Sequence, residues 1–146
     1  MVSFEQIDVT GCRAKGPMTF AGEIGPKHHA IILGRNTIDG LIYVAELLKT
    51  GYQIATFADF DSRYSKNGDI SIEPLEDTES GLQSAHHALA EIASGANSKY
   101  NLITNNCESF VNRSIKGSSV SGQVVTTIGL LIQVASVWIL KRRDDA

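Results

Sequence analysis

Apolar runs alternate with polar turns in the first half of the chain and predict a small antiparallel sheet. An apolar run at 28–34 is followed by an Asp-Gly pair at 39–40, which favours a tight hairpin, and then by a second apolar run at 41–48. After a glycine break, larger residues alternate with polar or small neighbours over 52–60. We therefore expect a meander of about three strands over 28–60.

The segments on either side of this meander lack a strong periodicity. Residues 1–27 contain repeated glycine breakers and are predicted to be irregular. Residues 61–73 are polar and predict a loop with a short edge strand at 70–72. We expect little regular structure in either segment apart from that strand.

Two helices are predicted in the second half of the chain. Ser80 and Gln83 have the spacing of a capping box, and apolar residues then recur at helical intervals up to Gly95, a residue typical of helix ends. The second helix is expected to begin at Asn105, with Glu108 as its capping partner, and to end before the next glycine. An antiparallel sheet packed against helices is the α+β class.

The C-terminal part of the chain has a composition of its own. Residues 118–123 form a Gly/Ser linker, and the uncharged apolar segment 124–140 is close to the shortest helix that spans a bilayer core. Trp138 and the basic residues of the charged tail 141–146 would lie at the membrane interface. We expect a membrane-anchor helix. A buried core helix, a helix packed in an oligomer and a helix lying in the interface are the alternatives.

Composition and charge narrow the function classes. With 146 residues the chain has the length of one domain that buries a core without disulfides or metals. The net charge is -3 and no basic run occurs in the first 140 residues, so nucleic-acid binding is not expected. The N-terminal sequence does not resemble a secretory signal, and the expected compartment is reducing and cytoplasmic.

The two cysteines are the residues most informative about possible chemistry. The chain has Cys12 and Cys107, too few for a disulfide framework, and no zinc-binding spacing. Cys107 falls in the first turn of the second predicted helix, where free N–H groups and the helix dipole stabilise a thiolate and can bind an oxyanion. The pattern therefore makes Cys107 a candidate nucleophile.

A thiolate nucleophile also needs a base, and the chain has four histidines. His28 and His29 open the first apolar strand, where their rings point to opposite faces, so only one of them can face a site. His86 and His87 lie among alanines in a predicted helix, which favours solvated or helix-packing rings. Structural roles stay open for all four, and a lone helical cysteine is most often a small buried residue.

Two motifs in a fixed order indicate a family. HHAIILG, followed by a hairpin, a helix and NNCESFVN, resembles the H-box and NC-box of the lecithin:retinol acyltransferase-like family, a circularly permuted branch of the papain-like NlpC thiol hydrolases. The later stretches SGQV, TTIGLLIQVASVWIL and KRR resemble its H-Ras-like suppressor group of phospholipase A/acyltransferases. The resemblance covers about residues 15–143 and implies a permuted papain-like (NlpC-type) domain over 1–117.

The resemblance assigns catalytic roles to individual residues. It implies that Cys107 is the nucleophile and His28 its base. Glu46 aligns with the third catalytic position and would orient His28. Tyr43 takes that place if the hairpin has a different register, because a slip of one residue exchanges the two faces.

The sequence departs from the family pattern at three positions in or near the two motifs. His29 stands where the family usually has an aromatic residue, so its ring is expected on the other side of the strand. Ser109 replaces a second histidine after the NC-box cysteine and is expected to affect hydrogen bonding around the site rather than the chemistry. Glu46 stands where the family often has a histidine, which leaves substrate class and rate open.

The resemblance also implies a function. It predicts a thiol-dependent phospholipase A/acyltransferase that acts on lipid esters through a Cys107 thioester, with no metal or organic cofactor. Its partners would be a phospholipid or other acyl ester and a membrane reached through residues 124–140, with the catalytic domain in the cytoplasm. Two alternatives remain: a cysteine peptidase or amidase of the NlpC kind, acting as a toxin or effector, and a non-catalytic interaction scaffold.

Overall fold

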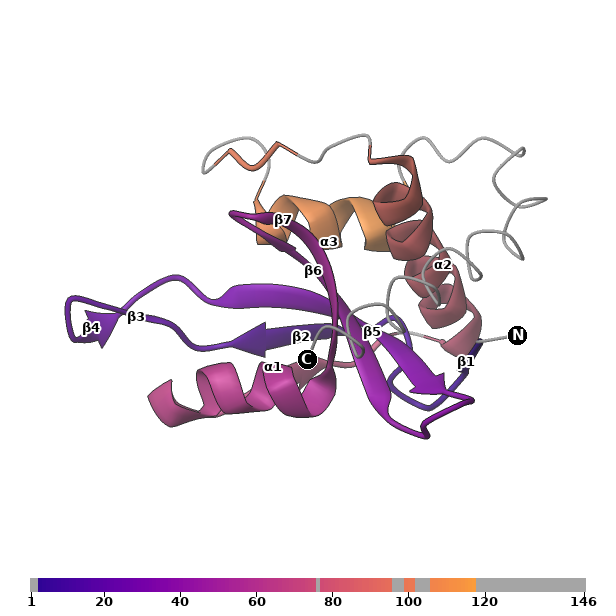
Figure 1. The fold of residues 1–146 in the computed structure, drawn as a ribbon, viewed down its shortest axis with the longest axis horizontal. Coiled ribbons are helices and arrows are strands. Elements are labelled where there is room, and N and C mark those ends of the chain that lie inside the picture. Colours follow the sequence, from indigo (N-terminus) through magenta and orange to yellow (C-terminus); the bar gives the residue numbers. More distant parts are fainter. Residues whose placement is uncertain (1–2, 76, 96–98, 102–105, 118–146) are drawn as a thin grey trace.

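An antiparallel sheet of six strands lies at the centre of the protein (Figure 1). The computed structural model describes residues 3–75, 77–95, 99–101 and 106–117. The sheet has the order β7–β6–β5–β2–β8, with β1 paired to the end of β5, and the hairpin β3–β4 projects away from it. The strands are β1 (Phe4–Glu5), β2 (Arg13–Gly16), β3 (Thr19–Phe20), β4 (Glu23–Ile24), β5 (His28–Asn36), β6 (Ile42–Leu48), β7 (Gly51–Thr56) and β8 (Ser71–Glu73).

The predicted meander is confirmed. Strands β5, β6 and β7 follow one another in the sequence and pair antiparallel, and the predicted Asp-Gly pair lies in the β5–β6 turn. The short strand predicted at 70–72 is β8, found one residue later at the edge of the sheet. Apolar periodicity was sufficient here because these strands are buried on at least one face.

The prediction that residues 1–27 are irregular is wrong. Strand β2 pairs with β5 on one side and with β8 on the other, so it lies inside the sheet. Its residue Ala14 is fully buried, whereas Arg13 and Lys15 are half-buried. A strand of four residues with two charged side chains is too short and too polar for its alternation to be recognised.

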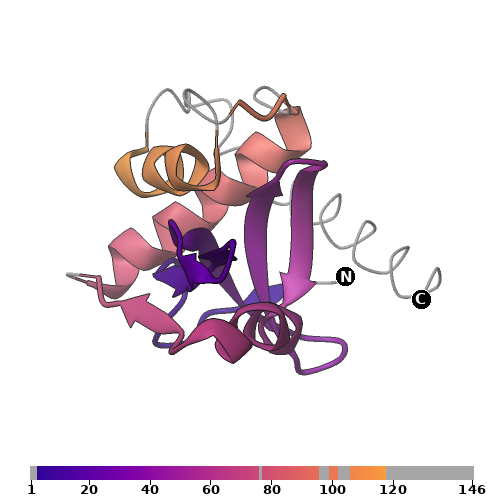
Figure 2. The same cartoon turned by 90° about the vertical axis from the view of Figure 1, so that its left-hand side faces the viewer.

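Helices cover both faces of the sheet (Figures 1 and 2). Helices α2 (Thr78–Ser94) and α3 (Cys107–Lys116) lie on one face, and α1 (Phe57–Tyr64), with the short 3₁₀ helix η1 (Ser65–Asn67), lies on the other. The two cores follow the alternation of β5. Ile31 packs with the α2 and α3 side chains, whereas Ala30 and Ile32 join the core around Phe60 of α1. The observed architecture is therefore α+β.

Helix α1 occupies residues that were predicted as strand and loop. The strand predicted over 52–60 ends at Thr56, whose Oγ1 accepts a hydrogen bond of 3.1 Å from the Asp59 N–H and caps the helix. Phe60 is completely buried on the inner side of α1. The polar loop predicted next is wrong for its first half, since α1 and η1 continue through it.

The two longer helices begin at caps other than the predicted ones. Asp77 caps α2 by accepting a hydrogen bond of 2.7 Å from the Ser80 N–H, so Ser80 is the third residue of the helix rather than its cap. The predicted stop at Gly95 is confirmed by its left-handed φ of 64°. Helix α3 is capped by Asn106 instead of Asn105. Adjacent polar residues compete for each cap, and local spacing does not decide between them.

The predicted linker, the apolar segment 124–140 and the charged tail lie outside the described residues. Within the part of the chain that is described, no helix has the length and hydrophobicity needed to cross a membrane. The anchor helix therefore stays a prediction.

Candidate active site

His28 and Glu46 meet on the α1 face of the sheet. The β5–β6 ladder begins at the Ile31–Ala45 pair, and continuing its register puts Glu46 diagonal to His28 on the same face. Nε2 of His28 lies 2.8 Å from Oε1 of Glu46, and both side chains are buried. The structure thus brings together two of the three residues that the family resemblance selected.

Glu46 is a fully buried carboxylate with three hydrogen-bond donors. Besides His28, Arg63 donates through NH2 to Oε2 at 2.6 Å, and Gln53 donates through Nε2 to Oε2 at 3.1 Å. Burial acts to raise the pKa of Glu46, but the hydrogen bonds and charges of His28 and Arg63 lower it overall. Glu46 is therefore an anion near neutral pH and stabilises the protonated form of His28.

Two side chains of α1 complete this part of the site. The Arg63 guanidinium pairs with Glu46 and lies 5.2 Å from the ring centre of Tyr64. The Tyr64 ring stacks on the His28 imidazole, with centroids 4.9 Å apart. Burial raises the pKa of Tyr64 to about 12, which keeps the phenol neutral. The prediction from sequence missed both residues because it did not include α1. The spacing of Thr56 and Asp59, which is typical of a helix cap, was the local signal for this helix.

Cys107 is the first residue of α3 and contacts β5 beyond the end of the β5–β6 ladder. Its Sγ shares a hydrogen bond with the His28 side chain and accepts from the main-chain N–H groups of His29 and Glu108. Since Nε2 of His28 is bound to Glu46, Nδ1 is the ring nitrogen that faces the sulfur. The contacts form a continuous chain from Cys107 through His28 to Glu46.

Electrostatics in this chain favour a charge-separated pair. Burial acts to raise the pKa of Cys107, but the His28 side chain and the two main-chain donors lower it below its ordinary value. Burial acts to lower the pKa of His28, but hydrogen bonds to Cys107 and Glu46 raise it overall. The two shifts move toward each other, so the thiolate and the imidazolium stabilise one another.

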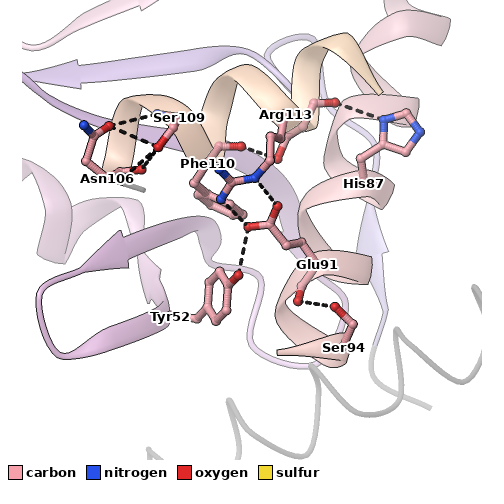
Figure 3. A network of polar contacts seen from close by, with 9 residues as sticks. Tyr52, His87, Glu91, Ser94, Asn106, Ser109, Phe110 and Arg113 are labelled. Atoms are coloured by element: carbon pink, nitrogen blue, oxygen red, sulfur yellow. Dashed lines mark hydrogen bonds and ion pairs between the residues drawn. The ribbon is translucent and has the colours of Figure 1, made fainter. Parts of the chain in front are cut away.

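The start of α3 is fixed by a capping box. Asn106 Oδ1 accepts from the Ser109 N–H at 3.0 Å, and the Ser109 hydroxyl accepts from the Asn106 N–H at 2.6 Å (Figure 3). Ser109 therefore affects hydrogen bonding next to Cys107, as expected, and it does so as a capping residue. The box leaves the first N–H groups of α3 directed toward the end where Cys107 lies.

The other end of α3 is tied to α2 and β7 (Figure 3). Arg113 donates to both carboxylate oxygens of Glu91, at 2.6 and 2.9 Å, and the Tyr52 hydroxyl donates to Glu91 at 2.9 Å. Nδ1 of His87 lies 2.9 Å from the Ser114 carbonyl oxygen. His87 is thus a helix-packing residue, in agreement with the simpler interpretation of its pattern.

The other residues considered from the sequence lie away from the sulfur. The Tyr43 hydroxyl donates to Asp39 at 2.5 Å, so the alternative register that would put Tyr43 beside His28 is not the one observed. Cys12 is a free, buried thiol whose pKa is raised by burial. It borders a separate cavity of about 420 Å³ that none of the proposed catalytic residues line.

A cavity of about 580 Å³ lies beside Cys107 and His28. Its lining includes the buried side chains of Cys107, His28 and Leu47 and the exposed side chains of Lys27 and Lys49. The exposed Glu108 also lines the cavity, and four of the remaining lining side chains are apolar or aromatic and half-buried. They are Met18, Leu48, Tyr64 and Tyr100.

The arrangement has the parts needed for nucleophilic attack on a carbonyl carbon. These are a sulfur of lowered pKa, a histidine that can hold and return a proton, and a carboxylate that orients the histidine. The N–H groups at the start of α3 lie beside the sulfur, where an oxyanion would form. No protein-family model, curated protein or solved structure matches the chain.

Proposed function

We propose that this protein is a thiol-dependent phospholipase A or acyltransferase that acts on lipid esters at a membrane. The observation that carries the proposal is the chain of contacts from Cys107 through His28 to the fully buried Glu46. A buried carboxylate on a histidine beside a cysteine has a high desolvation cost, which is typical of a catalytic site rather than of a structural contact.

In the proposed first half-reaction, the Cys107 thiolate attacks the ester carbonyl carbon. The carbonyl oxygen takes the negative charge and is stabilised by N–H groups at the start of α3. When the tetrahedral intermediate collapses, the C–O bond to the leaving alcohol breaks, and His28 gives its proton to that oxygen. Glu46 keeps the imidazole oriented throughout. The product is a thioester between the acyl group and Cys107.

In the proposed second half-reaction, water or another acceptor attacks the thioester. His28, now neutral, removes the acceptor's proton, and the carbon–sulfur bond breaks to restore the Cys107 thiolate. Water as acceptor releases a fatty acid, whereas an amine or a lysolipid hydroxyl receives the acyl group. Every proton and electron pair in this cycle is handled by the side chains described above.

The cavity supports a lipid substrate. Its apolar lining suits an acyl chain, and its exposed lysines are suited to a phosphate-bearing headgroup. The apolar segment 124–140, which lies outside the described residues, would hold the domain close to such a substrate.

The decisive experiment is detection of the acyl-enzyme. The full chain is incubated with mixed phospholipid vesicles, quenched in acid and digested, and the peptides are examined by mass spectrometry. We expect a fatty-acyl adduct on Cys107 in the wild type and in Cys12→Ser, and none in Cys107→Ala. Turnover should fall by roughly 10³-fold or more in Cys107→Ala, with an unchanged circular dichroism spectrum, and stay near wild type in Cys12→Ser.

Two other outcomes would contradict the lipid assignment in different ways. An absent adduct together with rapid alkylation of Cys107 at neutral pH would indicate a peptidase or amidase. An absent adduct together with an inert thiol would indicate an interaction scaffold. Equal loss of turnover in the two cysteine variants would contradict the assignment of the nucleophile.

A further inference from the structure

Arg13 of β2 lies at the centre of a polar cluster next to the start of α3. Its NH1 lies 2.7 Å from Nδ1 of His29 on β5, and its NH2 donates to Oδ1 of Asn112 on α3 at 2.5 Å. Its Nε lies 3.4 Å from Oε2 of Glu73 on β8. The Arg13 side chain is 12% exposed, and its guanidinium joins β2 to three other elements.

Two of these elements carry the proposed catalytic pair. His29 follows His28 on β5, and Asn112 belongs to the helix that begins with Cys107. A guanidinium is planar and presents its donors in a rigid fork, so binding both partners fixes the position of α3 relative to β5. Lysine has a single ammonium group and does not reproduce this geometry.

Arg13 also determines the tautomer and the protonation state of the His29 ring. A guanidinium only donates, so Nδ1 of His29 accepts and the neutral ring carries its proton on Nε2. Burial and the charge of Arg13 lower the pKa of His29, which agrees with a neutral ring. The ring faces away from His28, but the main-chain N–H of His29 donates to the sulfur of Cys107.

This main-chain N–H is available because of where the strands separate. The β5–β6 ladder begins at Ile31 and Ala45, so the preceding residue pairs of the two strands are not part of it. The N–H of His29 points toward the β6 side of β5, as does that of Ile31, and bonds to Cys107 instead of to a strand. The pairing of His29 with Lys15 of β2 and the contact of Arg13 with the His29 ring both hold this part of β5.

We propose that Arg13 is a positioning residue for the nucleophile: it holds His29 and α3 so that the His29 N–H stays hydrogen-bonded to the Cys107 sulfur. The inference rests on the proposed role of Cys107 as the nucleophile. Arg13 does not line the cavity beside Cys107 and acts only through His29 and Asn112. The Arg113–Glu91 pair on the same helix is a matched comparison, because it anchors α3 to α2.

The thiolate is also influenced by groups from the other elements around it, and the test has to leave these unchanged. Arg13 contacts His29 and Asn112, and Arg13→Lys keeps the positive charge, so the substitution tests the geometry of this contact. The titratable groups that interact with the sulfur include His28 of β5, Tyr64 of α1 and Tyr100 of the segment between α2 and α3, whereas Glu108 of α3 contributes its main-chain N–H.

The test measures the pH profile of Cys107 alkylation in the full chain. Iodoacetamide labelling at Cys107 is separated from labelling at Cys12 by peptide mass spectrometry. In Arg13→Lys we expect the profile to move to higher pH by about one unit, which is about a tenfold lower rate below the pKa. In Arg113→Lys we expect the wild-type profile, although thermal unfolding should show a loss of stability in both variants.

A milder variant keeps the proposal testable if Arg13→Lys does not fold. Asn112→Ala removes the α3 half of the contact, and its profile should move in the same direction by a smaller amount. A wild-type profile in Arg13→Lys would overturn the proposal, because a retained positive charge would then suffice. Equal shifts in Arg13→Lys and Arg113→Lys would also overturn it, because any contact that anchors α3 would then have the same effect on Cys107.

These outcomes are independent of the lipid assignment, because alkylation involves no acyl substrate. A shifted profile without an acyl adduct would support the role of Arg13 and contradict the lipid function. An acyl adduct together with unshifted alkylation profiles would support the lipid function and contradict the role of Arg13.

Discussion

At the scale of single residues, the protein is distinguished by the charge that it buries at Glu46. The carboxylate is completely inaccessible and receives hydrogen bonds from His28, Arg63 and Gln53. A buried charge persists only where its partners offset the loss of hydration. The desolvation free energy of this carboxylate is explained if His28 requires its negative charge.

Substituting Glu46 tests this requirement. In Glu46→Gln we expect a fall in acyl-enzyme formation of roughly 10²- to 10⁴-fold, because the imidazolium loses its counter-charge and its orientation. The pKa of His28 should drop, so the high-pH limb of the rate profile moves to lower pH. Gln53→Ala removes a donor but keeps the charge and should change the rate only slightly. Similar rates in the two variants would contradict the role of Glu46.

The same variant should also change how stability depends on pH. The folded-state pKa of Glu46 is lowered, so the stability that it contributes is present above the unfolded-state value of about 4.3 and is lost as pH falls through the folded value. The folded-state pKa of His28 is raised, so its contribution is present below about 6.5 and is lost as pH rises through the folded value. Chemical denaturation of Glu46→Gln across pH should show a weaker dependence in both windows.

At the scale of elements, the start of α3 determines the surroundings of Cys107. The capping box of Asn106 and Ser109 defines the first turn, and Cys107 is the first residue of that turn. Free N–H groups and the positive end of the helix dipole lie there. A helix that frayed at this end would lose both the donors and the position of the sulfur.

Removing the cap tests this element. Asn106→Ala should lower the free energy of unfolding by about 0.5–2 kcal/mol and slow alkylation of Cys107 at pH 7, because the first turn of α3 frays. Asp77→Ala removes the equivalent cap of α2 and should destabilise the protein without slowing alkylation. Denaturant melts and timed labelling distinguish the two effects. Equal slowing in both variants would mean that general loosening, and not the cap of α3, controls the thiol.

At the scale of the whole molecule, the sheet lies between two helical layers (Figure 2). The residues of the candidate site come from both sides of the sheet. Glu46 and the His28 ring face α1, whereas α3 with Cys107 belongs to the other layer. The contact between Cys107 and His28 connects the two layers beyond the end of the β5–β6 ladder. The same region borders the cavity that Cys107 and His28 line.

Membrane attachment is a prediction for the whole chain. Deleting residues 124–146 should move the protein from the membrane pellet to the supernatant in fractionation, because the apolar segment would supply the attachment. Alkylation of Cys107 should continue at the wild-type rate in the shortened chain, which shows that the domain is still folded. If the shortened protein still sediments with vesicles, another surface binds the lipid and the anchor prediction is wrong.

The sequence by itself determined the features that depend on neighbouring residues. The β5–β7 meander, the C-terminal stop of α2 and the position of Cys107 in a first helical turn all follow from periodicity and local spacing. The pairing of Glu46 with His28 was anticipated only through the family resemblance, and the observed hairpin register places the two side chains on one face. Prediction from local sequence failed for β2 and α1, because their patterns of apolar and polar residues are too short or too ambiguous to be recognised.

Only the tertiary structure decided which distant side chains complete the site. Arg63 reaches Glu46 because α1 packs across the sheet, and Arg13 contacts Asn112, 99 residues away in the sequence, because β2 pairs inside the sheet near α3. An isolated arginine in a polar stretch has no local pattern that names its partner. Such contacts depend on the packing of whole elements, and the energy that holds them arises only when burial brings the charged groups together.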